Sequence, residues 1–121
     1  MKVLLCMIYL HLIDDYVLQG WLASAKSKSW WQKNCPDKKY NKDYIIALVE
    51  HGFMNSFLIH IPIYLWLYNN INILTISIII GTIFHAIVDD LKANKYRINL
   101  IQDQLLHILY ISIIWNIFIF L

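Results

Sequence analysis

The stretch 73–92, ILTISIIIGTIFHAIVDDLK, joins a long apolar run to a cluster of ionisable residues. The run itself is typical of a helix that faces membrane lipid. Its last turns carry His85, Asp89 and Asp90, and Lys92 closes it. Ionisable side chains at membrane depth are costly, so they pair, face water or bind a ligand. The stretch therefore predicts a membrane helix with a functional site near one end.

The composition of the whole chain favours the same setting. Of its 121 residues, 60% are hydrophobic and only 15% are charged, and the mean hydropathy is +0.53. A soluble domain of this length buries too small a share of its chain to hide so much apolar surface. We therefore expect a membrane protein that forms one compact domain.

Four apolar segments make up most of the chain. They cover about 3–22, 44–68, 71–91 and 99–121. Each is close to the roughly 20 residues that a spanning helix needs, and runs this long in a bilayer favour helix over strand. The sequence predicts an all-α fold, a membrane-embedded four-helix up-down bundle in a single transmembrane domain. A basic interfacial loop at 23–43 joins the first two helices.

Basic residues mark one side of this bundle. The loop 23–43 carries six lysines, and the connection 92–97 carries two lysines and an arginine. In an up-down bundle both connections lie on the same side, which the positive-inside rule places in the cytoplasm. We expect a multi-pass protein of the inner (cytoplasmic) membrane with both termini outside. A loop at the lipid surface explains lysines beside tryptophans more simply than nucleic acid does, so no nucleic-acid partner is expected.

Histidine and aspartate recur four residues apart in three of the apolar segments. Residues at this spacing lie on one face of a helix and can meet the same metal ion. One such pair has a simpler explanation as a cap or a local hydrogen bond, but three pairs in one small chain are harder to dismiss. The pairs are His11/Asp15, His85/Asp89 and Asp103/His107, and His51 stands alone on the second segment.

All of these residues fall at one depth of the predicted bundle. With 1.5 Å of rise per residue, they lie roughly 5–12 Å from the basic face. Such a layer suits one or two divalent transition-metal ions, such as zinc, manganese or iron. A His–Asp network that only joins the helices and a proton relay are the alternatives. His60 lies nearer the far side and is left out. The predicted ligands are His11, Asp15, His51, His85, Asp89, Asp103 and His107.

Three blocks of the sequence carry a likeness to known proteins. HLIDDYVLQGWLASAKSK (11–28), HAIVDDLK (85–92) and DQLLH (103–107) follow one another in order. They resemble the DUF3307 family of phage and bacterial membrane proteins over nearly the whole chain. The departures are Asp14, where the family usually has a small residue, and the region 44–60. By analogy, the resemblance implies a membrane-bound, metal-dependent hydrolase.

Other polar residues near this layer are candidates for the chemistry. Lys26 and Lys92 lie at the basic face and are expected to hold a phosphate, although membrane anchoring explains them equally well. Either Asp14 or Asp90 is a candidate for the general base or for a group that supports a metal ligand. The two candidates for orienting ligands or a leaving group are Gln19 and Gln104.

Taken together, these features predict a metal-dependent hydrolase that acts on a phosphate ester or a membrane lipid at the cytoplasmic face. Two alternatives stay open. One is a carrier of metal ions or protons that uses the same residues. The other is a non-catalytic phage membrane protein that acts on membrane partners of the host.

Overall fold

The computed structural model describes residues 1–121 and is entirely helical, with six α-helices and no strand. This confirms the prediction of an all-α fold. The α-helices are α1 (Lys2–Ile13), α2 (Leu22–Ala25), α3 (Lys28–Asn34), α4 (Asp43–Trp66), α5 (Ile71–Ala93) and α6 (Leu100–Phe120); a π-helix, η1 (Asp14–Leu18), follows α1, and a 3₁₀-helix, η2 (Lys38–Tyr40), precedes α4.

Three of the helices, α4, α5 and α6, are long and apolar enough to cross a membrane. Their ends lie within two residues of the predicted ones. The predicted first helix, 3–22, is interrupted. After α1 the chain continues as the π-helix, and the helical path breaks at Gly20, whose φ of +51° lies in the left-handed region that glycine tolerates best. The segment 23–43, expected as a loop, contains most of α2 and all of α3 and η2.

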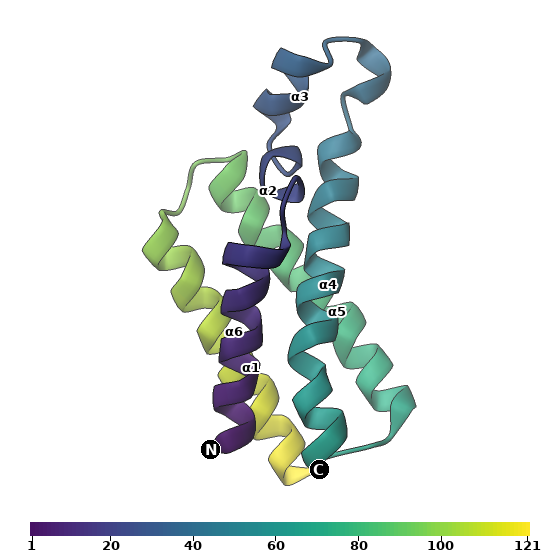
Figure 1. Ribbon diagram of the computed structural model, residues 1–121, viewed down its shortest axis with the longest axis vertical. Coiled ribbons are helices and arrows are strands. Elements are labelled where there is room, and N and C mark those ends of the chain that lie inside the picture. Colours follow the sequence, from purple (N-terminus) through teal and green to yellow (C-terminus); the bar gives the residue numbers. More distant parts are fainter.

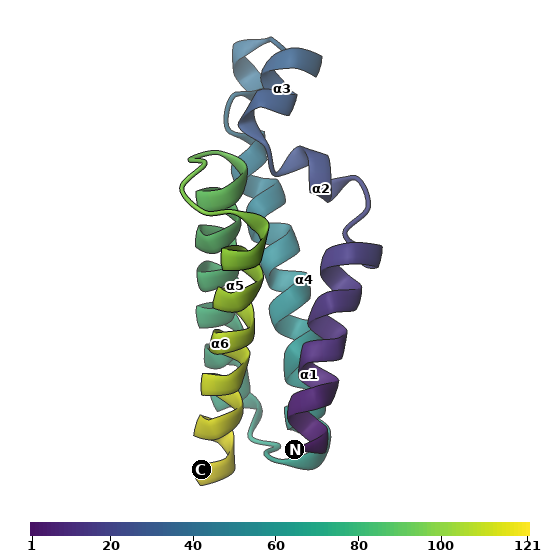
Figure 2. The ribbon, with the colours of Figure 1, turned by 90° about the vertical axis from the view of Figure 1, so that its left-hand side faces the viewer.

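Helices α1, α4, α5 and α6 lie side by side along the long axis of the molecule (Figures 1 and 2). Helix α4 packs against α5 and α1, and α6 packs against α1 and α5. Both chain termini lie at one end, and α2, α3 and the connection between α5 and α6 lie toward the other (Figure 1). The apolar core contains Met7, Ile59, Ile63, Leu74, Ile111, Ile114 and Phe118.

The outer faces of the long helices are strongly apolar. Ile76, Ile79 and Ile83 on α5, and Leu105 and Leu109 on α6, are each more than half exposed. Soluble monomers rarely expose contiguous apolar patches this extensive. These faces are of the kind that membrane lipid covers.

The start of α6 is fixed by a capping box. The Asn99 side chain accepts a hydrogen bond from the Gln102 main-chain nitrogen (2.9 Å), and the Gln102 side chain accepts one from the Asn99 nitrogen (3.0 Å). This arrangement satisfies two of the free N–H groups at a helix N-terminus. It also sets the rotation of the helix, which turns Asp103 and His107 toward the bundle interior, where both are buried.

A close approach of α4 and α5 is centred on Gly52. A Cβ atom at this position would lie 2.7 Å from the Thr82 carbonyl oxygen and 3.3 Å from the Ala86 nitrogen. The absence of a side chain lets the two backbones approach. As a result, the rings of His51 and His85 lie with their centroids only 4.8 Å apart.

We expect Gly52→Ala to destabilise the protein, because the added methyl group meets backbone rather than a movable side chain. Overpacking of this kind typically costs about 1–3 kcal/mol, which exceeds the gain of about 1 kcal/mol that alanine brings in helix propensity. Unfolding by a denaturing detergent measures the difference. A more stable Gly52→Ala variant would show that the helices are not in close contact here.

Candidate metal centre

Four helical segments bring histidine and aspartate side chains to one buried cluster. Each of the eight side chains has at most 7% of its surface exposed. All seven ligands predicted from the sequence belong to it, together with Asp14. The members of this His/Asp cluster are His11, Asp14 and Asp15 from α1 and η1, His51 from α4, His85 and Asp89 from α5, and Asp103 and His107 from α6.

The π-helix explains how two consecutive aspartates both point inward. In an α-helix, neighbouring residues are about 100° apart around the axis, so one of two adjacent side chains usually turns away from the core. Here the Gln19 main-chain nitrogen bonds to the Asp14 carbonyl five residues back (3.0 Å). The wider turn keeps both Asp14 and Asp15 buried. Single π-helical turns occur frequently at functional sites.

One group of four ligand atoms surrounds a common point; we call it the first ligand set. It consists of Asp15 Oδ1, His51 Nε2, His85 Nε2 and Asp89 Oδ2. His51 Nε2 lies 3.1 Å from Asp15 Oδ1 and 3.7 Å from Asp89 Oδ2, and His85 Nε2 lies 3.7 and 3.6 Å from the same two oxygens. A tetrahedron with metal–ligand bonds of about 2.0–2.2 Å has edges of about 3.3–3.6 Å. The four atoms are thus close to the spacing of a metal site.

A second ligand set lies on the other side of Asp89. Its atoms are Asp89 Oδ1, Asp103 Oδ1 and His107 Nε2, and the nitrogen lies 3.5 Å from each oxygen. All three are buried and have no hydrogen-bond partner. Asp89 presents one oxygen to each set, as a carboxylate that bridges two ions does. Three protein ligands also leave a coordination position open, as in catalytic zinc sites.

Asp14 and Asn55 support the first ligand set. Asp14 Oδ2 lies 3.6 Å from His51 Nδ1, the ring nitrogen opposite the one in the set. The Asn55 amide donates to the same carboxylate oxygen at 3.0 Å. A carboxylate behind a ligating histidine orients its ring and raises its basicity. Sequence reasoning missed Asn55, although it follows His51 by four residues and so shares its helix face.

His11 lies in the cluster but in neither ligand set. Its Nδ1 contacts the Asn55 side chain, and its Nε2 lies 3.3 Å from Gln104 Oε1. Both ring nitrogens are therefore engaged by amides, and the ligand role predicted for His11 is replaced by a place in the surrounding hydrogen-bond network. The His11 ring also packs 5.0 Å from the ring of His107.

The two predicted glutamines differ in position. Gln104 Nε2 donates to Asp15 Oδ2 (2.9 Å) and to Asp103 Oδ2 (3.2 Å), so it connects the two ligand sets. Gln19 instead donates to the main-chain carbonyl of Asp15. Gln104 thus has the geometry to orient ligands, whereas Gln19 supports only the backbone of the π-helix.

Two lysines reach the cluster from the basic end. Lys26, only 6% exposed, places its Nζ 2.6 Å from Asp89 Oδ2. Lys92 Nζ lies 2.5 Å from Asp103 Oδ2, and its side chain keeps 29% of its surface exposed. Both ammonium groups thus neutralise carboxylates of the ligand sets. Anchoring at the membrane surface does not account for these inward orientations.

Asp90 lies outside the cluster. Its carboxylate is 3.1 Å from Lys95 Nζ and accepts a hydrogen bond from Asn94 (2.9 Å). The reason is the helix period, since Asp89 faces the bundle and the next residue is turned about 100° away. Asn94 also donates to the Lys26 carbonyl (3.0 Å), which ties the α2 end to the end of α5. The catalytic role predicted for Asp90 is replaced by a structural one.

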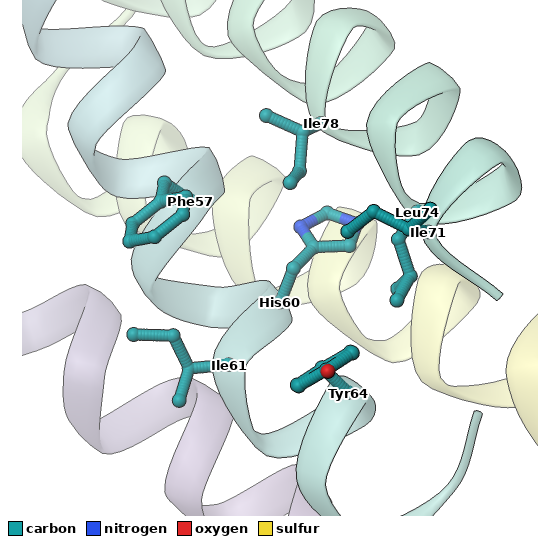
Figure 3. A pocket seen from close by; sticks show the side chains of 7 residues that line it. All are labelled: Phe57, His60, Ile61, Tyr64, Ile71, Leu74 and Ile78. Carbon is teal, nitrogen blue, oxygen red and sulfur yellow. The ribbon is translucent and has the colours of Figure 1, made fainter. Parts of the chain in front are cut away.

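His60 stands apart from the metal ligands, as predicted. Its Nδ1 donates to the Ser56 carbonyl and its Nε2 accepts from the Ser77 hydroxyl, both at 2.7 Å. It forms the inner wall of an apolar groove of about 220 Å³ between α4 and α5, beside Leu74 and Ile78 (Figure 3). With both nitrogens satisfied and only apolar neighbours in the groove, His60 has no free atom for a metal.

No protein-family model, curated protein or solved structure matches this chain. The resemblance to the DUF3307 family therefore stays a prediction. The molecule itself defines an all-α protein with three helices able to span a membrane. It also contains buried His/Asp groups that could hold a metal ion.

Proposed function

We propose that this chain is a membrane-embedded protein that binds two divalent transition-metal ions in its His/Asp cluster. The second ligand set carries the proposal, because Asp89 Oδ1, Asp103 Oδ1 and His107 Nε2 face one another with no hydrogen-bond partner. Unpaired buried polar atoms are rare in native proteins and each calls for an explanation. A network that only joined the helices would pair these atoms. Nitrogen and carboxylate ligands together suit zinc, manganese or iron.

The metal proposal is tested by elemental analysis of protein purified in mild detergent without chelators. We expect bound transition metal in the wild type, and His107→Ala to lose most of it, since His107 supplies the nitrogen of the second ligand set. His60→Ala is the matched control, since His60 is equally buried but bonds only to Ser56 and Ser77. Wild-type protein without metal, or equal loss in both variants, would contradict the proposal.

The same proposal places α1, α4, α5 and α6 as a four-helix bundle in the inner membrane, with both termini outside. The lysine-rich segment 23–43 and the connection after α5 lie together at the end opposite the termini (Figure 1), which supports a cytoplasmic position for that end. Helix α1 and the π-helix together are 17 residues long, or about 25 Å. This is slightly short of a hydrocarbon core of about 30 Å, and local thinning of the bilayer accommodates such a difference.

Cysteine labelling from each side of the membrane tests the topology. In a chain whose own cysteines are replaced (Cys6→Ala, Cys35→Ser), Ser29→Cys and Asn70→Cys each place one thiol at an exposed position. We expect a membrane-impermeant reagent to label Asn70→Cys from outside and Ser29→Cys only after the membrane is opened. Labelling of both positions from the same side would rule out the arrangement.

The activity that we propose is hydrolysis of a phosphate ester or a lipid at the cytoplasmic face. A pair of bound metal ions supplies an activated water and stabilises negative charge on a phosphoryl oxygen. The chain adds two ammonium groups at the edge of the cluster, of which Lys92 is partly exposed and Lys26 is buried. An anionic group that approaches from the basic end meets Lys92 first. Gln104 holds Asp15 and Asp103 in place beside it.

A carrier of metal ions or protons is the second candidate. Buried polar groups continue beyond the cluster, away from the basic end: the Tyr110 hydroxyl has no partner, and His60 is bonded to Ser56 and Ser77. The apolar core, with Ile63 and Phe118 among its members, then closes the path. Uptake of Mn²⁺ or protons into proteoliposomes separates the two functions, since the hydrolase transports neither.

A further inference from the structure

We propose that the second metal ion binds together with a phosphate dianion, and that the substrate is a phosphate monoester rather than a diester. This inference rests on the proposed metal centre and deepens it. It starts from charge, because charges buried at membrane depth must be balanced locally. Four carboxylates belong to the cluster: Asp14, Asp15, Asp89 and Asp103. Only Lys26 and Lys92 place ammonium groups against them.

The net charge of the cluster then limits how many cations it holds. Metal ligation requires ionised carboxylates and neutral imidazoles. In that state four carboxylates and two ammonium groups leave a net charge of about −2. One divalent ion balances it. A second divalent ion leaves an excess of about +2 in surroundings of low dielectric constant, so it needs an accompanying anion.

The second ligand set is where this anion belongs. The first set offers four protein atoms, enough for a closed tetrahedral site, whereas the second offers three and leaves a position open. His107 Nε2 and Asp103 Oδ1, each on a side chain at most 2% exposed, point into it without a partner. Lys92, the partly exposed lysine, contacts the other oxygen of Asp103. The open position therefore faces the basic end of the bundle.

The required charge selects the class of ligand. A phosphate monoester carries a charge of about −1.5 to −2 at neutral pH, which matches the excess left by a second ion. A diester carries a single negative charge and leaves part of the excess. In hydrolysis of the monoester, a bond forms between the oxygen of water and phosphorus while the ester P–O bond breaks. The departing oxygen takes a proton from the water, which yields an alcohol and inorganic phosphate. The product is again a dianion, so inorganic phosphate is itself a suitable probe.

Titration with Mn²⁺, followed by electron paramagnetic resonance on the full chain in lipid nanodiscs, tests this inference. We expect one tight Mn²⁺ per chain without phosphate. With inorganic phosphate a second ion should bind about tenfold more tightly or better, with the broadened spectrum of two coupled ions. By reciprocity, Mn²⁺ must tighten phosphate binding by the same factor. Methyl phosphate should act as phosphate does, and dimethyl phosphate should have little effect.

A change of charge in the cluster gives an independent check. Lys26→Met makes the cluster more negative by one charge, so the second Mn²⁺ should depend several-fold less on phosphate. Lys95→Met is the matched control, because Lys95 pairs with Asp90 outside the cluster, and its dependence should equal that of the wild type. Two Mn²⁺ ions that bind equally well with and without phosphate would overturn this inference and leave the metal centre intact. No Mn²⁺ binding at all would overturn both.

Discussion

Asp89→Asn is expected to remove both metal ions from the purified protein. The Asp89 carboxylate presents Oδ2 to the first ligand set, near His51 and His85. Its Oδ1 faces His107 in the second set. An amide in its place has no negative charge and only one oxygen, so both sets lose a ligand. Loss of an outer-shell partner alone typically lowers metal affinity 10–100-fold, and we expect loss of this bridging ligand to exceed about 100-fold at each site.

The matched control for this variant is the neighbouring residue. Asp90→Asn makes the same chemical change one position along α5, but the Asp90 carboxylate contacts Lys95 and Asn94 outside the cluster. Its metal content, measured by elemental analysis after equal purification, should equal that of the wild type. Phosphatase activity on a panel of lipid and soluble phosphate esters should follow the metal content. Equal metal loss in the two variants would indicate general unfolding, and full metal retention in Asp89→Asn would exclude the bridging role.

Much of the fold can be predicted from the sequence because long apolar runs in a short chain leave few alternatives. Each of the runs that form α4, α5 and α6 is bounded by polar residues, such as the asparagines at 69–72 and Asn99. The interruption of the first helix cannot be predicted in this way. A π-helix depends on the satisfaction of one carbonyl five residues on, and hydropathy is insensitive to that choice.

The candidate site divides along the same line. The spacing of His85 and Asp89 on one helix, and its reverse at Asp103 and His107, places these groups on inward faces at one depth without knowledge of the fold. The partners of each group depend on contacts between helices. Lys26 is 63 residues from Asp89 along the chain, and no periodicity connects them. The same holds for His11, whose inward position was predictable while its engagement by two amides was not.

Lys26→Met should produce a stability loss that depends on metal. The Lys26–Asp89 pair is short (2.6 Å) and both side chains are almost fully buried. Removing one partner of a buried ion pair typically costs about 3–5 kcal/mol, because the remaining charge is left without compensation. In protein treated with a chelator, we therefore expect detergent-induced unfolding to show a loss of about 3 kcal/mol. With saturating Mn²⁺ the loss should be much smaller, because an ion bound to Asp89 then provides the missing positive charge.

Lys95→Met provides the comparison that makes this result specific. Its ion pair with Asp90 is longer (3.1 Å) and the lysine is 54% exposed, so the expected loss is below about 1 kcal/mol and equal with and without Mn²⁺. A loss for Lys26→Met that does not change on addition of Mn²⁺ would mean that no ion reaches Asp89. The opposite outcome, a large loss in chelator that metal restores, would show that Lys26 and the ion neutralise the same carboxylate. The lysine would then hold the bundle together while the centre is empty of metal.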